Sequence, residues 1–113
     1  MALMAASFPI SPGKTEEWKR WMTELNGPRR REFVASRQAA GVRERTFLQP
    51  TPMGDFVVVT LEGDDPAGAF ARMTRSTDAF TTWFLAKAKE IHGFDLTAVP
   101  EGPLSQLVVD SAG

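Results

Sequence analysis

The stretch "DFVVVTLE", residues 55–62, decides the fold, because it is rich in β-forming residues and apolar on both of its faces. A strand of this kind is usually covered on both sides. It follows "VRERTFLQ" (42–49), which is also β-rich but mixed in polarity, and "PTPMG" (50–54) supplies the prolines and the glycine of a hairpin loop. The centre of the chain is therefore predicted to be an antiparallel hairpin.

A broken helix is predicted on each side of this hairpin. The first half of the earlier one has apolar residues at helical spacing (Trp18, Trp21, Met22, Leu25), and residues 26–28 ("NGP") interrupt it. Its second half ends at Gly41, a residue typical of helix C-termini. The later helix starts at Pro66 behind an aspartate cap, breaks near residues 75–78, and continues with a second apolar stripe (Phe80, Trp83, Phe84, Ala88, Ile91).

Two outer strands complete the expected architecture. Alternation at Ala6, Phe8 and Ile10 predicts the first strand, and "LSQLVV" (104–109) predicts the last. The resulting order is βαββαβ, the ferredoxin-like α+β arrangement, with a four-stranded antiparallel sheet and broken helices on one face. At 113 residues, the chain is expected to form a single domain over residues 1–113.

Composition excludes several classes of function. With 13 basic and 14 acidic side chains the net charge is −1, so the electrostatic footprint of a nucleic-acid-binding protein is missing. There is no cysteine and only one histidine, and no cofactor-binding motif, so neither a metal site nor a cofactor is expected. No apolar run approaches the ~20 residues of a membrane span. The opening "MALMAASFPI" is interpreted as a strand rather than a signal peptide, and a cytoplasmic location is expected.

The expected hairpin register assigns residues to the two faces of the sheet. A simple loop over residues 50–54 places Leu48 opposite Phe56, Thr46 opposite Val58 and Glu44 opposite Thr60, on the face away from the helices. Phe47, Val57, Val59 and Leu61 are then the residues that pack under the helices, although a slip of one residue inverts the assignment. Either way a large apolar patch stays exposed, which monomers rarely tolerate. A homodimer with a partly polar space between two sheets is predicted.

The segment "FPISPGKTEEWKRW" (8–21) resembles the opening of the dimeric α+β barrel superfamily, in which a strand runs into a Pro-Gly-Lys helix start followed by an aromatic residue. The resemblance covers residues 4–110 in topology and residues 8–18 in recognisable motif. The superfamily includes antibiotic-biosynthesis-type monooxygenases, muconolactone-isomerase-like proteins and stress-responsive barrel proteins. The stretch "RERTFLQPTPMGDFVVVTLEGDDP" (43–66) is more similar to one of its uncharacterised bacterial families. A fold of this kind does not by itself define a reaction.

Two residues are candidates for catalysis, each with a structural alternative. Glu44, in a semi-dry cavity, is a candidate general base. The favoured alternative is that it pairs with a neighbouring arginine on a solvated edge strand. His92 lies in the last turn of a helix directly before Gly93. The favoured interpretation is that it caps this helix, and the alternative is a proton shuttle at the mouth of the sheet.

Three functions remain open on the sequence. The first is binding of a small hydrophobic molecule, with a lining formed by Thr46, Leu48, Phe56, Val58, Thr60 and Trp83. The second, which the resemblance implies, is a cofactor-independent monooxygenase or isomerase acting on an aromatic or polyketide-type substrate. Such monooxygenases commonly place Asn, Trp or His around the lumen. In this chain the only Asn is Asn26, in a helix break, the only His is His92, at a helix end, and there is no tyrosine. That departure puts haem-degrading and quinone-forming activities in doubt. The third is a structural or interaction subunit.

Overall fold

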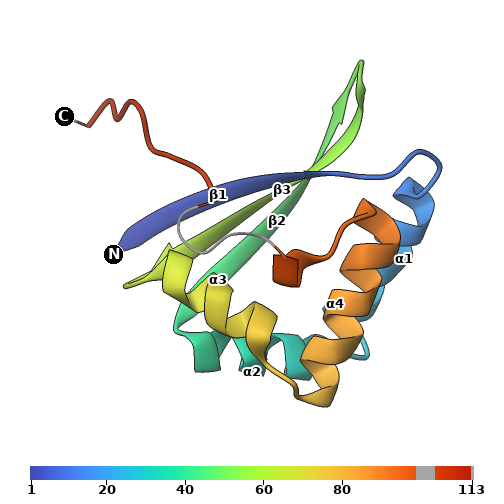
Figure 1. Cartoon of the computed structure of the whole chain (residues 1–113), viewed down its shortest axis with the longest axis horizontal. Coiled ribbons are helices and arrows are strands. Elements are labelled where there is room, and N and C mark those ends of the chain that lie inside the picture. Colours follow the sequence, from blue (N-terminus) through green and yellow to red (C-terminus); the bar gives the residue numbers. More distant parts are fainter. Residues whose placement is uncertain (99–103, 113) are drawn as a thin grey trace.

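The computed structural model describes residues 1–98 and 104–112, and the described strands form one antiparallel sheet. The strands are β1 (Ala2–Pro9), β2 (Val42–Thr51) and β3 (Gly54–Gly63), in the order β1-β3-β2. The helices are α1 (Thr15–Asn26), α2 (Arg30–Ala40), α3 (Pro66–Arg75) and α4 (Ala79–His92), and a short 3₁₀ turn, η1, spans Leu96–Ala98. The helices lie on the same side of the sheet (Figure 1). The α+β class is confirmed, with β3 at the centre.

Several helix ends lie where local sequence signals predict them. The interruption after Asn26 separates α1 from α2, and Gly41 ends α2 in the left-handed conformation with φ of 76°. Asp65 and Asp78 cap α3 and α4, because each carboxylate accepts a hydrogen bond from the backbone N–H three residues later, at 3.0 and 2.8 Å. Both predicted broken helices are therefore confirmed.

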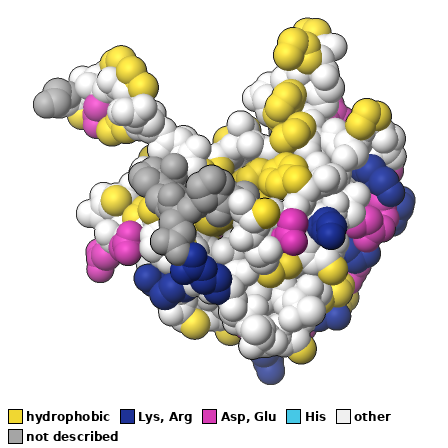
Figure 2. Space-filling view, in the orientation of Figure 1, with side chains coloured by type: hydrophobic (Ala, Val, Ile, Leu, Met, Phe, Trp, Pro, Cys, Tyr) yellow, Lys and Arg dark blue, Asp and Glu magenta, His cyan; other side chains and the backbone are white. Residues whose placement is uncertain are grey.

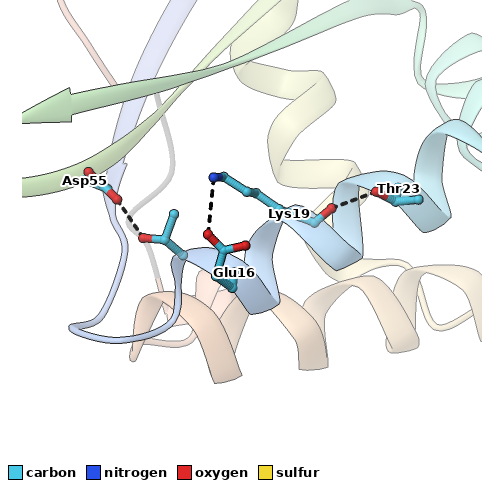
Figure 3. Close-up of polar contacts among 5 residues, drawn as sticks. Glu16, Lys19, Thr23 and Asp55 are labelled. Atoms are coloured by element: carbon cyan, nitrogen blue, oxygen red, sulfur yellow. Dashed lines mark hydrogen bonds and ion pairs between the residues drawn. The ribbon is translucent and has the colours of Figure 1, made fainter.

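The start of α1 is tied to the start of β3. Gly13 has φ of 82°, which favours glycine, and the turn that it forms delays the helix to Thr15. The Thr15 hydroxyl then donates a hydrogen bond of 2.7 Å to the Asp55 carboxylate (Figure 3), and the Asp55 carbonyl accepts from the Ile10 N–H at 2.9 Å. One residue of β3 thus fixes both the end of β1 and the first turn of α1.

The predicted fourth strand is not formed. Residues 104–109 adopt no strand conformation, and this C-terminal segment runs away from the helices (Figure 1). Leu107, Val108 and Val109 are each more than three-quarters exposed. Few contacts with the same chain hold these residues, so their β-propensity alone does not create a strand. The described residues therefore form a three-stranded sheet and not the predicted four-stranded one. Residues 99–103 lie outside the described residues.

The hairpin register differs by one residue from the expected one. Glu44 pairs with Leu61, Thr46 with Val59 and Leu48 with Val57. The reason is the turn, which contains only Pro52 and Met53, because β2 continues to Thr51 and β3 begins at Gly54. The Thr51 hydroxyl stabilises this tight turn by donating to the Gly54 carbonyl at 2.6 Å. The turn length sets the register of the whole hairpin.

This register changes the face assignment of β2 but not that of β3. Val57 and Leu61 are buried under the helices, and Val59, half-buried, lies on the same face, as predicted. Phe47 was expected beside them but lies on the open face with 53% of its surface exposed. Glu44, Thr46 and Leu48, expected on the open face, lie under the helices. The prediction for β2 was wrong because a slip of one residue reverses every side chain of a strand.

The core consists of two clusters on the helical side of the sheet. The larger has nine buried residues from β3, α1, α4 and their connections, among them Trp18, Trp21, Val57 and Ile91. The smaller joins Met4, Val42, Leu61 and Ala69. Val59 and Phe70 pack against both clusters. The candidate site lies at this junction.

Candidate functional site: a cavity between the sheet and the helices

Two adjoining cavities of about 70 and about 50 Å³ lie between the sheet and the helices. The larger, here called the arginine lobe, has Arg37 in its wall, and the smaller, the tryptophan lobe, has Trp18 and Trp21. Both lobes are lined by Phe8, Glu44, Val59, Phe84 and Leu96. Most of the remaining wall is apolar. A concave, mostly apolar space with a few polar groups is the usual form of a small-molecule site.

The polar part of the wall is a buried ion pair. Arg37 Nε lies 2.8 Å from Glu44 Oε1, and the two side chains are only 10% and 8% exposed. The second carboxylate oxygen of Glu44 accepts from the Thr46 hydroxyl at 3.1 Å, and Arg37 Nη1 donates to the Ser36 hydroxyl at 3.0 Å. The carboxylate is therefore held in one orientation by a helix and by its own strand.

Aromatic rings enclose the Arg37 guanidinium. Its central carbon lies 4.8 Å from the centre of the Phe33 ring and 4.7 Å from that of Phe84. A cation over an aromatic face is attracted by the electron-rich ring, and guanidinium stacks well on such faces. These contacts fix the arginine at the edge of an otherwise apolar space.

Stability alone does not explain why Arg37 and Glu44 form a buried ion pair. Removing two charges from water is expensive, and a buried pair can often be replaced by apolar residues without loss. The neighbouring pair on the open face, Arg45 and Glu62 at 3.7 Å, is more than one-third exposed and avoids most of that penalty. Within the described residues, these two ion pairs lie on opposite faces of the sheet, and the Arg37–Glu44 pair borders a cavity.

His92 forms part of the wall of the tryptophan lobe. Its Nδ1 lies 2.8 Å from the Pro9 carbonyl oxygen. Because a carbonyl can only accept, Nδ1 carries the proton and Nε2 of the neutral ring is an acceptor. Burial lowers the pKa of His92 below its usual value, and the bond to Pro9 opposes this shift. His92 ends α4 as predicted, but its ring bonds to β1 rather than capping its own helix.

The predicted ligand-binding residues are divided between the two faces of the sheet. Thr46 lines the tryptophan lobe, and Leu48 packs against the larger core cluster beneath the same face. Phe56, Val58 and Thr60 lie on the opposite face, as the alternation along β3 requires. Trp83 lies outside both lobes, with the Arg29 guanidinium 4.0 Å above its ring. The candidate catalytic residues Glu44 and His92, however, share the tryptophan lobe.

Arg37 is the site residue that the sequence analysis missed. A local signal was present, since Arg37 follows Phe33 by four residues in α2 and therefore shares its face. A charged residue on the apolar stripe of a helix indicates either a solvated edge or a buried partner. Glu44 is that partner, only seven residues later.

Residues 1–98 and 104–112 contain neither a cluster of metal-ligating side chains nor a membrane-spanning helix. No three His, Asp or Glu side chains of these residues come together as a set that could hold a metal ion. None of their helices has the length and apolar character needed to cross a bilayer.

The chain is a small α+β protein with an internal, mostly apolar cavity. The chain belongs to a family described as "Family of unknown function (DUF6176)", whose model matches residues 1–98. The match includes every described strand and helix and therefore both lobes of the cavity. No curated protein and no solved structure matches the chain.

Proposed function

We propose that the protein binds a small, largely apolar molecule in the cavity between its sheet and its helices. The observation that carries the proposal is the buried Arg37–Glu44 pair in the wall of an apolar space. A buried pair that apolar residues of similar size could often replace without loss of stability, and that borders a cavity, is well placed to orient a ligand. The low polarity around the pair also strengthens its interaction with any polar group of that ligand.

The size of the cavity limits the ligand. An engineered cavity of about 150 Å³ holds benzene. Adjoining lobes of about 70 and about 50 Å³ together offer less space than this, so the ligand is limited to about the size of benzene, as in a five-membered ring or a short branched chain. Larger aromatic or polyketide-type compounds require the helices to move apart.

Two adjacent valines of β3 provide the test. Val59 lines both lobes, whereas Val58 lies on the opposite face. Val59→Phe is expected to fill the space and abolish binding of methylenecyclopentane, measured by NMR titration, while Val58→Phe keeps the wild-type affinity. Thermal unfolding of each variant checks that it is folded. Loss of binding in Val58→Phe, with binding retained in folded Val59→Phe, would contradict the proposal.

An isomerase-like activity is the second candidate, supported by the position of His92. The neutral ring has an acceptor nitrogen and lies on the same lobe as Glu44. Such a group can remove a proton next to a carbonyl and return it. The test is exchange of the α-protons of cyclopentanone in D₂O, followed by NMR. Exchange that the wild type accelerates and His92→Asn does not supports an enzyme, and equal rates with and without protein refute it.

We also propose that two copies of the chain associate through the open face of the sheet, as a dimeric α+β barrel. The support is the exposed apolar surface, which includes Leu3 and Phe47. Apolar side chains also gather on the projecting hairpin tip and on the C-terminal segment, both of which stand away from the body (Figure 2). A second copy offers the same surfaces and covers them symmetrically.

The C-terminal segment 104–109 is proposed to cover β1 of the second copy. In the described residues β1 pairs only with β3, so its other edge has free backbone groups. Light scattering is expected to report a dimer for the wild type and a monomer for Phe47→Arg. Val34→Arg, on the outer surface of α2, is the matched control and stays dimeric. A monomeric wild type at micromolar concentration refutes this assembly.

A further inference from the structure

Two tryptophans that line the tryptophan lobe each carry a polar group without a hydrogen-bond partner among the described residues. The indole nitrogens of Trp18 and Trp21 are buried, and neither has a hydrogen-bond partner among the described residues. Only 6% and 4% of the two residues is exposed. Buried N–H groups in folded proteins are almost always paired with protein, water or ligand. Two unpaired donors on residues that line the same lobe therefore point to an occupant of that lobe.

Both donors belong to the same wall. Trp18 and Trp21 are three residues apart in α1, so their side chains share one face of the helix, and both residues line the tryptophan lobe. An indole N–H can only donate. A molecule that forms hydrogen bonds with these two N–H groups must therefore supply an acceptor atom.

The other polar groups of this lobe restrict the charge of that acceptor. The two oxygens of Glu44 already accept from Arg37 and Thr46, and the Arg37 guanidinium faces Glu44. A ligand carboxylate would be placed near Glu44 without a cation of its own, which like charges disfavour. A neutral oxygen meets the two N–H groups without this repulsion.

We propose that the molecule bound in the cavity is a small neutral carbonyl compound, such as a cyclic ketone, whose oxygen accepts hydrogen bonds from Trp18 and Trp21. This inference rests on the proposed function and specifies its ligand. The ring or chain of the compound occupies the space beside Val59 and Phe84, which line both lobes. An ordered water on the two indoles is the competing occupant.

The test compares two probes of the same shape on the wild type and on tryptophan variants. Cyclopentanone has the carbonyl, and methylenecyclopentane has a carbon in place of the oxygen. Trp18→Phe and Trp21→Phe each keep an aromatic ring and remove one N–H group. At least one of them is expected to weaken cyclopentanone binding about fivefold to tenfold, the typical loss when a neutral buried hydrogen bond is removed. The affinity for methylenecyclopentane stays within about twofold.

Indole N–H resonances of the unmodified protein give a second readout that does not depend on variants. The chain has three tryptophans, and Trp83 lies outside the cavity, so its resonance is an internal reference. Cyclopentanone is expected to move the Trp18 or Trp21 N–H signal downfield and leave Trp83 in place. Methylenecyclopentane causes no comparable downfield shift.

The outcomes separate the inference from the proposed function. If both probes bind and the tryptophan variants affect them equally, the carbonyl proposal is overturned and the binding cavity stands. If neither probe binds, both are overturned. A downfield shift confined to Trp83 places the ligand elsewhere and also overturns the inference.

Discussion

The two faces of the sheet come from alternate residues of the same strands, yet they differ in chemistry. The covered face holds Val57, Val59 and a buried ion pair beside a cavity. The open face holds Val58, Phe47 and an exposed ion pair. The comparison teaches that a period of two residues is enough to give one strand two surfaces of different chemistry, one proposed for binding and one for association. Neighbouring residues are therefore natural controls for one another.

The largest expected difference is between the two arginines of the ion pairs. Arg37→Ala leaves the Glu44 charge buried without its partner and should lower the free energy of unfolding by about 3–5 kcal/mol. Arg45→Ala removes an exposed partner and should lower it by less than about 1 kcal/mol. Urea unfolding at one fixed protein concentration measures both. The double variant Arg37→Met with Glu44→Leu should recover most of the loss, and equal losses for the two single variants would contradict the comparison.

A smaller difference is expected between two adjacent valines. Val57 is 2% exposed, and Val57→Ala removes two buried methyl groups, which should lower the free energy of unfolding by about 2 kcal/mol. Val58→Ala changes the open face and should lower it by less than about 1 kcal/mol. The measurement is best made in the Phe47→Arg background, in which the proposed partner does not cover Val58. A greater loss for Val58→Ala would reverse the assignment of the faces.

The smallest effect concerns pH. The pKa of His92 is lowered in the folded protein from 6.5 because the ring is buried, so the unfolded chain binds more protons as the pH falls. The contribution of His92 to the free energy of unfolding should therefore be fully present above pH 6.5. It should be lost as the pH falls from 6.5 towards the lower pKa of the folded protein. His92 is the only histidine, so His92→Asn should remove this slope in chemical denaturation measured across pH 5–7.5. The pKa values of Asp78 and Asp95 are also lowered, from 3.8, so these carboxylates change the stability at a lower pH than His92 does. An unchanged slope in the variant would show that His92 is not its source.

Much of the fold could be predicted because its signals are local. The proline and glycine positions around Asn26 and Gly41 mark helix ends wherever the chain later packs, and the run of valines in β3 indicates a central strand. The register of β2 could not be predicted as well, because it depends on whether the turn contains two residues or more. The C-terminal segment has the composition of a strand, but its pairing depends on a neighbour that the sequence does not specify.

The candidate site was predictable in part. Glu44 and His92 were selected from their residue types, and both line the tryptophan lobe. Glu44, however, was expected on the other face of the sheet. Arg37 was missed because its partner becomes visible only when α2 is placed against β2. The tryptophans show the same limit, since Trp18, Trp21 and Trp83 have similar helical spacing but only the first two reach the cavity. Helix periodicity identifies a buried face and not the part of that face that borders empty space.

The most direct test of the account is a methyl NMR titration of the wild-type protein with methylenecyclopentane. The three consecutive valines of β3 report on both faces in one spectrum. Binding in the cavity predicts that the methyl signals of Val57 and Val59 shift with ligand concentration while those of Val58 stay in place. Shifts of Val58 without those of Val57 and Val59 would place the ligand on the open face and contradict the account.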